Sequence, residues 1–225
     1  MNKETPLEQQ PISVLLHSRS VLEGEQCVAT GVLSHLEGNL MNIELPEFEQ
    51  FRLGEQVKVT MYSPAGMHHF ITKIIARHQG TLFLVHPPHQ QKKFNEKREY
   101  PRVEVRKHGF ITAYGTTEGV VSVSSPIPIQ IKDISIKGIG FTMSESTAER
   151  MMLDVGGVLQ AELHLGQKLP CSLRIVRHRE QEVDRFFGAA IEEMSVAAAR
   201  SLHAFVLSKQ VFTHIDSKSK QVRRG

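Results

Sequence analysis

The sequence predicts an all-β protein made of two small antiparallel β-barrels joined by a basic linker, with a C-terminal helix on the second barrel. Most of the 225 residues fall into short stretches of β-branched or alternating apolar residues, each bounded by Gly, Pro or polar clusters. Short strands at such close spacing are typical of barrels and sandwiches rather than of alternating strands and helices. The clearest stretches are 57–61, 70–76, 81–85, 127–134, 158–165 and 169–176.

One long stretch near the C-terminus has the helical pattern instead. Apolar residues between Val196 and Val206 recur at spacings of three and four, and Ser195 stands where a capping residue is needed. A shorter helix is predicted over 146–153. Only these two segments interrupt the predicted strands of the second half.

A faint internal repeat favours two barrels of similar design. The segments 54–59 and 73–78 resemble 156–161 and 174–178, although any two antiparallel β segments share some likeness. The prolines at 87 and 88 disfavour both helix and central strand, as expected of a linker. We therefore expect an N-terminal barrel over 1–91, a second domain with its basic linker over 92–213, and a flexible basic tail over 214–225.

Positive charge is concentrated in the linker. The chain has 27 Lys and Arg against 24 Asp and Glu, but residues 92–107 alone hold seven basic and three acidic residues. The first residues are polar, no apolar run could span a bilayer, and Cys27 and Cys171 lie far apart in sequence. We therefore expect a cytoplasmic protein with no membrane insertion, no disulfide framework and no paired-cysteine zinc site.

Two polar patterns predict a binding site. Arg98 and Arg102 share one face if the linker is extended around them. Asp133 and Ser135 point to one side of a predicted strand because strand side chains alternate, and Gly138 permits a turn or a close backbone approach. Taken alone, the aspartate and serine could also end a strand in a side-chain-stabilised turn.

Guanine fits this set of groups. Its O6 and N7 accept two hydrogen bonds from one arginine, and its N1 and N2 protons need an acceptor such as a carboxylate. Guanidinium groups also pair with phosphate through two hydrogen bonds and stack on flat bases. The predicted site therefore suits a ligand with several anionic and planar groups.

The order of these residues resembles the PilZ domain, a bacterial receptor domain for cyclic dimeric guanosine monophosphate (cyclic di-GMP). An Arg-x-x-x-Arg pattern at 98–102 is followed by Asp-x-Ser-x-x-Gly at 133–138, and the likeness covers about 95–212 with the strand at 187–191. Residues 11–91 resemble, more weakly, the N-terminal domain of flagellar-brake proteins, through the turn and strand at 53–57.

The resemblance implies that the ligand-binding residues are Lys97, Arg98, Arg102, Asp133, Ser135 and Gly138. The two arginines would clamp phosphates and the Hoogsteen edge of guanine, the carboxylate and hydroxyl would hold the base edge, and the glycine would keep the surface open. In the family, the residue before the first arginine influences whether one ligand or an intercalated pair binds. A lysine at that position favours a pair.

These expectations describe a cytoplasmic receptor, associated with the flagellar basal body if the flagellar-brake likeness holds, that needs no cofactor. Cyclic di-GMP would change the arrangement of the barrels and so the surface offered to a protein partner, with flagellar motor components as the expected partners. The sequence shows no candidate pair of a catalytic nucleophile and a general base, so an enzyme is not expected. The twelve histidines lack the spacing of a metal site.

Two other functions remain open. The basic segment could make the chain a barrel that binds single-stranded nucleic acid, but such modules add exposed aromatic residues, and only Phe94 and Tyr100 lie near the arginines. Alternatively, the chain could be an adaptor that acts through protein contacts alone. The intact motif disfavours this, because a site that had lost its ligand would have lost some of these residues.

Overall fold

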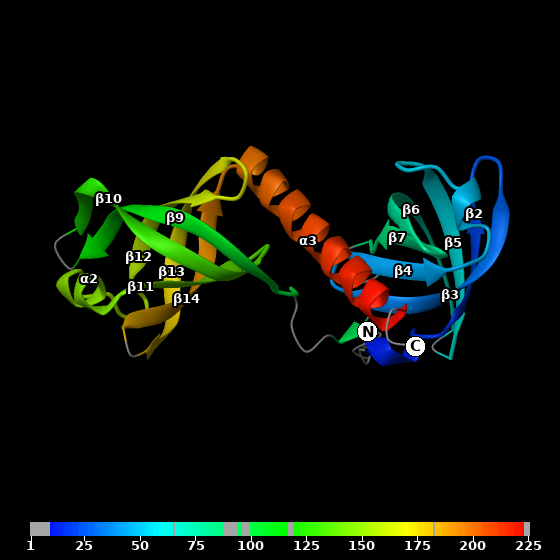
Figure 1. Cartoon of the computed structure of the whole chain (residues 1–225), viewed down its shortest axis with the longest axis horizontal. Helices are drawn as coiled ribbons and strands as arrows, with labels where there is room; N and C mark the ends of the chain where they lie inside the picture. The colour runs from blue at the N-terminus through cyan, green and yellow to red at the C-terminus, as the bar shows by residue number, and fades with distance from the viewer. Residues whose placement is uncertain are drawn as a thin grey trace, which may run out of the picture. The chain divides into compact units, whose positions relative to one another are not determined.

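The computed structural model describes residues 10–64, 66–87, 94–95, 100–116, 119–181 and 183–222. The predicted fold class is confirmed: these residues form two closed six-stranded antiparallel barrels and a C-terminal helix (Figure 1). By compactness the chain divides into one unit of Met1–Pro101 with Gln210–Gly225 and a second unit of Arg102–Lys209. The expected boundary between residues 91 and 92 lies outside the described residues and stays a prediction.

The first barrel closes on itself in the strand order β2-β3-β4-β7-β6-β5. Its strands are β2 (Arg19–Glu23), β3 (Val28–Glu37), β4 (Leu40–Glu44), β5 (Gln56–Ser63), β6 (Gly66–His78) and β7 (Thr81–Val85). Alternate side chains point inward, and Leu22, Leu33, Val59 and Ile74 are fully buried in the core.

Smaller elements complete this unit. The strands β1 (Gln10–Pro11) and β8 (Phe94–Asn95) form a short parallel pair that the sequence did not suggest. Two single-turn 3-10 helices, η1 (Ile12–Val14) and η2 (Phe48–Gln50), precede β2 and β5 respectively.

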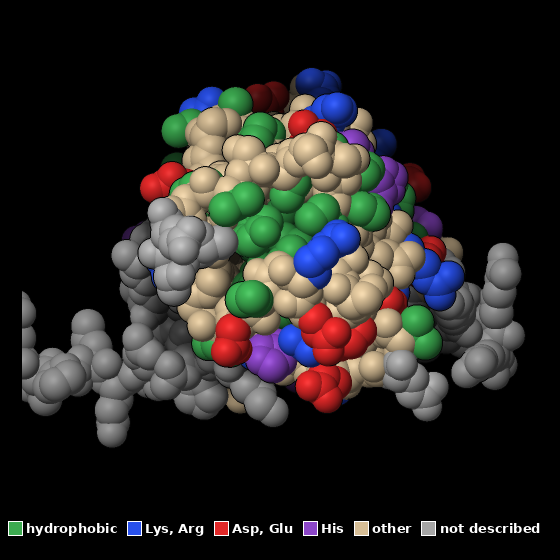
Figure 2. All heavy atoms as spheres, turned by 90° about the vertical axis from the view of Figure 1, so that its left-hand side faces the viewer, with side chains coloured by type: hydrophobic (Ala, Val, Ile, Leu, Met, Phe, Trp, Pro, Cys, Tyr) green, Lys and Arg blue, Asp and Glu red, His purple; other side chains and the backbone are tan. Residues whose placement is uncertain are grey.

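The second barrel closes in the order β10-β11-β14-β13-β12-β9. Its strands are β9 (Val103–Thr116), β10 (Gly119–Ser135), β11 (Gly138–Ser144), β12 (Val158–His164), β13 (Lys168–Glu180) and β14 (Asp184–Met194). Inside it, the rings of Phe141 and Phe187 stack at 5.3 Å between centroids. Helix α2 (Glu145–Arg150) follows β11 and is shorter than the predicted 146–153. Figure 2 shows hydrophobic side chains gathered at the surface, bordered by acidic and basic ones.

The two barrels share one topology. Numbered within each barrel, the strands follow the same cyclic order, 1-2-3-6-5-4. The internal repeat falls on equivalent strands: the amide of Gly54 donates to the carbonyl of Ile74, and the amide of Gly156 donates to that of Ile175, each at 2.8 Å. Both glycines have left-handed φ, +81° and +89°, which glycine adopts without steric cost. The repeat therefore reflects a real structural correspondence.

Helix α3 (Val196–Val222) begins as the sequence predicts, because the hydroxyl of Ser195 accepts a hydrogen bond from the amide of Ala198 at 3.2 Å. Its first turns pack on the second core through Leu202 and Val206. The helix continues to Val222 and so runs into the segment 214–225, for which a flexible basic tail is expected from the sequence. Its last part, from Gln210 onward, groups with the first barrel.

The last part of α3 lies against an outward face of the first barrel. Paired positions across β3, β4, β7 and β6 form the first-barrel row: His35, Asn42, Phe83 and Ala76. Asn42 and Phe83 are 0% and 1% exposed although neither belongs to the inner core. The His214 ring lies 4.9 Å from that of His35 and 5.7 Å from that of Phe83. Burial lowers the pKa of His35.

Candidate ligand-binding site

Arg102 and Asp133 lie together although they are 31 positions apart in sequence. Arg102 directly precedes β9, and Asp133 lies near the end of the neighbouring strand β10, beyond an irregularity in the strand pairing between Ile131 and Asp133. Arg102 Nη1 donates a hydrogen bond to Asp133 Oδ1 at 3.5 Å, and the two side chains are 32% and 23% exposed. The pair is partly shielded from solvent, yet both groups keep hydrogen-bonding capacity for a ligand.

Ser135 and Gly138 form the turn that follows. The Ser135 hydroxyl is buried, donates to the carbonyl of Gly138 at 3.2 Å and accepts from the amide of Lys137 at 3.4 Å. It therefore closes the turn between β10 and β11, and one acceptor lone pair remains. A Cβ at Gly138 would lie 2.6 Å from the carbonyl oxygen of Ala189, so this glycine permits the close approach of β14.

Two of the predicted ligand-binding residues, Lys97 and Arg98, lie outside the described residues. The structure thus brings together Arg102, Asp133, Ser135 and Gly138, at the start of β9 and around the β10–β11 turn. The assignment of all six residues to a ligand remains a prediction.

Two glycines within strands, Gly140 and Gly188, make room for charged side chains beside this turn. Paired positions across β10, β11, β14 and β13 form the second-barrel row: Asp133, Gly140, Gly188 and Arg177. A Cβ at Gly140 would collide with the Asp133 carboxylate, and a Cβ at Gly188 would lie 2.9 Å from Arg177 Cγ. The glycines therefore let the aspartate and arginine side chains lie flat against the sheet. Glycine inside a strand signals such an approach, so the sequence could have revealed both positions.

An aromatic ring lies beside the same row. A Cβ at Gly140 would be 2.8 Å from Cζ of Phe186, and the guanidinium groups of Arg177 and Arg179 each lie 5.8 Å from the centre of the Phe186 ring. A phenyl ring with two guanidinium groups offers planar surfaces that stack on a flat, electron-rich ligand. No sequence pattern predicted that these three residues lie together.

Asp133 also lines a basic cavity, together with residues of β9, β10 and α3. Its volume is about 1,020 Å³, which is ample for a dinucleotide-sized ligand. The charged residues lining this basic cavity are Arg106, Lys107, Lys132, Lys209, Glu104 and Asp133. Cations outnumber carboxylates by four to two, so the cavity favours an anionic occupant.

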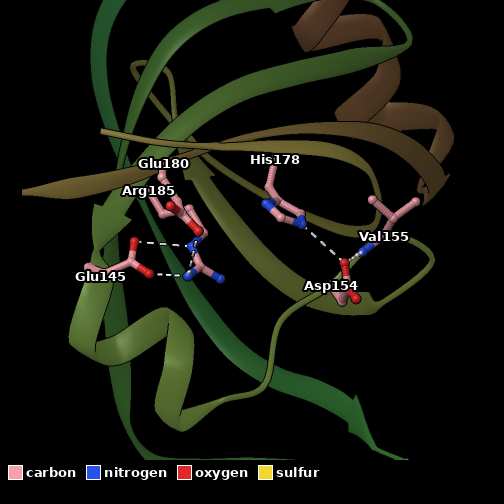
Figure 3. Close-up of polar contacts among 6 residues, drawn as sticks. All are labelled: Glu145, Asp154, Val155, His178, Glu180 and Arg185. Carbon is pink, nitrogen blue, oxygen red and sulfur yellow. Dashed lines mark hydrogen bonds and ion pairs between the residues drawn. The ribbon is translucent and has the colours of Figure 1, made fainter. Parts of the chain in front are cut away.

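A second charged group on this barrel is internally paired (Figure 3). Arg185 donates to both carboxylate oxygens of Glu145, which chiefly accounts for the raised pKa of Arg185. Asp154 accepts hydrogen bonds from the amide of Val155 at 2.6 Å and from the ring of His178 at 3.1 Å, and these bonds lower the pKa of Asp154. Because each charge has a partner, we assign this group to the framework.

Within the described ranges, no three His, Cys, Asp or Glu side chains are grouped so that they could hold a metal ion. Across the same part of the chain, every helix is too short or too polar to traverse a bilayer.

The solved structures to which this chain is similar share little sequence with it. The Bacillus subtilis inhibitor of motility, MotI/DgrA, is 16% identical, with 87% of this chain and 97% of that chain covered and a TM-score of 0.42. Escherichia coli YcgR, solved in complex with c-di-GMP, is 17% identical, with 95% and 96% covered and a TM-score of 0.40. The K. pneumonia MrkH–c-di-GMP complex is 13% identical, with 91% and 90% covered and a TM-score of 0.39.

Comparison at the level of sequence families is more decisive. No curated protein sequence matches the chain. The PilZ domain, however, matches residues 96–208, a range that includes Arg102 and the whole β10–β11 turn. Since this match spans half of the sequence, the chain belongs to the PilZ domain family.

Proposed function

We propose that this protein is a receptor for cyclic di-GMP that acts on a protein partner. The observation that carries the proposal is the meeting of Arg102 and Asp133 within the PilZ domain, at 3.5 Å. A guanidinium donor and a carboxylate acceptor held side by side match the Hoogsteen edge and the N1 and N2 protons of guanine. The basic cavity next to them suits the two phosphates of the ligand.

The proposed contacts divide by chemistry. Arg98 and Arg102 bind phosphate and the Hoogsteen edge, and Asp133 accepts from the base. Ser135 stabilises the β10–β11 turn and offers the remaining lone pair of its hydroxyl to the ligand. Gly138 allows β11 and β14 to lie close together. Lys97 adds positive charge next to Arg98 in the sequence, which favours two stacked ligands over one.

Isothermal titration calorimetry with cyclic di-GMP tests this assignment. Replacing Arg102 or Asp133 by alanine is expected to weaken binding about 10- to 100-fold, the effect of losing one bidentate pair to a base. Arg150→Ala, which removes a cation of α2 on the same barrel, serves as the control and should bind normally. Wild-type affinity in both site variants would refute the site. The same isotherm gives the number of ligands bound.

The proposed output is a change in the arrangement of the two barrels. Ligand contacts at residues 97, 98 and 102 fall on the segment that joins them, so binding energy is available to favour one arrangement. Small-angle X-ray scattering with and without cyclic di-GMP should show different profiles for the wild type and identical profiles for Arg102→Ala. Identical wild-type profiles would contradict this step alone.

The partner is proposed from the resemblance to flagellar brakes. Expression of the wild type under high cyclic di-GMP should slow swimming in its own host, whereas expression of Arg102→Ala should not. We also propose that the protein is a receptor and not an enzyme, so cyclic di-GMP incubated with it should be recovered intact by chromatography.

Binding of single-stranded nucleic acid is the competing function. A fluorescence titration with labelled oligonucleotides at several salt concentrations separates the two, because phosphate-dominated binding weakens steeply with salt. Tight oligonucleotide binding with no response to the cyclic dinucleotide would favour the competing function.

A further inference from the structure

The basic cavity gathers more positive charge than the two carboxylates in its lining balance. Arg106 and Lys107 come from β9, Lys132 from β10 and Lys209 from α3. In the part of the chain that the structure describes, none of these four side chains forms an ion pair with a carboxylate. Like charges brought together in this way repel one another, and an anion in the cavity relieves the repulsion.

Lys209 is held at the cavity by its own helix. Its Nζ lies 5.8 Å from the centre of the Phe205 ring, one turn earlier on α3, and Phe205 packs against the core of the second barrel. The cation–π contact restrains a side chain that is otherwise flexible. The ammonium group is therefore partly ordered before any ligand arrives, which lowers the entropy cost of binding.

The cavity adjoins the carboxylate that recognises the base in our proposed function. Asp133 belongs to its lining, as does its strand-pairing partner Glu104. A nucleotide whose base is held at Asp133 would place its anionic backbone within reach of this cavity. The two carboxylates repel simple anions, so the cavity does not bind every anion equally. They favour a ligand that also brings hydrogen-bond donors.

We propose that the basic cavity is a phosphodiester-binding subsite of the same receptor, and that Lys209 is the residue through which α3 contacts the ligand. This inference rests on the proposed function and extends it: the ligand is bound by the helix as well as by the linker and the β10–β11 turn. Lys132 and Arg106 contribute further charge from the strands. Gln210, the next residue, begins the part of α3 that groups with the first barrel.

The test uses the full-length protein and cyclic di-GMP in calorimetry. Lys209→Met keeps the aliphatic stem and removes the charge, so affinity should fall about three- to tenfold, the effect of one partly exposed charge-assisted contact. Lys209→Arg should stay within about twofold of wild type because it keeps the charge. Arg200→Met, which removes an exposed cation elsewhere on α3, is the matched control and should not change affinity.

Amide hydrogen exchange distinguishes a direct contact of Lys209 with the ligand from a role of Lys209 in stabilising α3. Cyclic di-GMP should slow amide exchange in residues 205–216 of the wild type and leave it unchanged in Lys209→Met. Without ligand, the two proteins should exchange alike. Faster exchange of the ligand-free variant would assign Lys209 a structural role and overturn the proposal.

The remaining outcomes are distinguishable. If Arg102→Ala weakens binding while Lys209→Met and Lys132→Met bind like the wild type, the subsite is refuted and the receptor function stands. If the wild type does not bind cyclic di-GMP at all, both proposals fail.

Discussion

The two barrels have the same strand order but use the equivalent outer face in opposite ways. The second-barrel row has charged residues at its ends and glycines at its centre, and Asp133 and Arg177 lie over the sheet. The first-barrel row has Asn42 and Phe83 at its centre, and the chain's own helix covers it. The side chains of each row, rather than the topology, decide whether this outer face is covered by the helix or left open.

The turn motif shows the same divergence. Strand-pairing irregularities occur at equivalent points, between Leu33 and His35 in β3 and between Ile131 and Asp133 in β10. Counting from these points, His35 stands where the second barrel has Asp133. Glu37 and Leu40 then stand where it has Ser135 and Gly138. The first barrel therefore keeps the backbone of the site without its chemistry.

The largest expected difference between the barrels is in thiol reactivity, because each contains one cysteine. Cys171 on β13 is 5% exposed, and burial raises the pKa of its thiol to about 12, whereas Cys27 is half-buried. At pH 8, iodoacetamide should alkylate Cys171 far more slowly than Cys27, because a buried thiol with a pKa of about 12 is ionised in only about one molecule in 10,000 at that pH. Timed mass spectrometry measures both rates, and Cys27→Ser isolates the slower one. Equal rates would show that the second barrel opens readily.

The second-largest expected effect is the loss of stability on removing the Phe83 ring, which His214 of α3 contacts. Phe83→Ala is expected to destabilise the first barrel by about 3–5 kcal/mol, as for other buried phenylalanines. Amide exchange in residues 210–216 should accelerate at the same time, because the His214 contact is lost. Urea denaturation measures the first effect. Val28→Ala, at an exposed apolar position of the same barrel, is the control. A loss below about 1 kcal/mol would mean that the helix does not seal this face.

Placing a residue of the first-barrel row in the second-barrel row should make the outer face of the second barrel more like that of the first. Gly140→Asn introduces the residue found at the equivalent position of β4, and its Cβ would displace the Asp133 carboxylate. Affinity for cyclic di-GMP should fall about 10- to 100-fold by calorimetry. Gly80→Asn, in the β6–β7 turn with nothing within 4 Å of the new Cβ, should bind normally. Unchanged affinity of the first variant would show that the position of Asp133 does not matter.

The smallest expected effect is a gain of stability. The Asn42 side-chain amide is fully buried and makes no hydrogen bond with any described residue. Asn42→Leu should therefore stabilise the first barrel by about 1 kcal/mol, because a leucine of similar size has no polar group to desolvate. Thermal denaturation gives the sign. A marked destabilisation would reveal that the amide has a partner, such as a buried water.

Sequence reasoning predicted those features that depend on local pattern. Alternation and turn residues predicted the strands, and the repeat at Gly54 and Gly156 predicted two barrels of one design, which the topology confirms. It also predicted that Arg102 and Asp133 belong to one site, and the structure places their side chains 3.5 Å apart. Glycines inside strands, at 140 and 188, were a usable signal that was overlooked.

Other features depend on contacts that no local pattern encodes. The basic cavity combines residues of β9, β10 and α3, which only strand register and helix packing bring together. The sequence of 214–225 predicted a flexible tail because this segment is polar and basic, whereas α3 extends through it to Val222. In the structure, Val211 is buried and His214 lies against the first barrel, and this contact over long sequence distance outweighs the composition.

The extent of α3 has a consequence for dissecting the protein into fragments. An N-terminal fragment ending at residue 101 would lack Val211 and His214, so Phe83, 1% exposed in the whole chain, would be bared to water. Such a fragment is expected to aggregate. A synthetic peptide of residues 205–222 added in trans should keep it in solution, and titrating that peptide would turn an intramolecular contact into a reaction with a measurable dissociation constant.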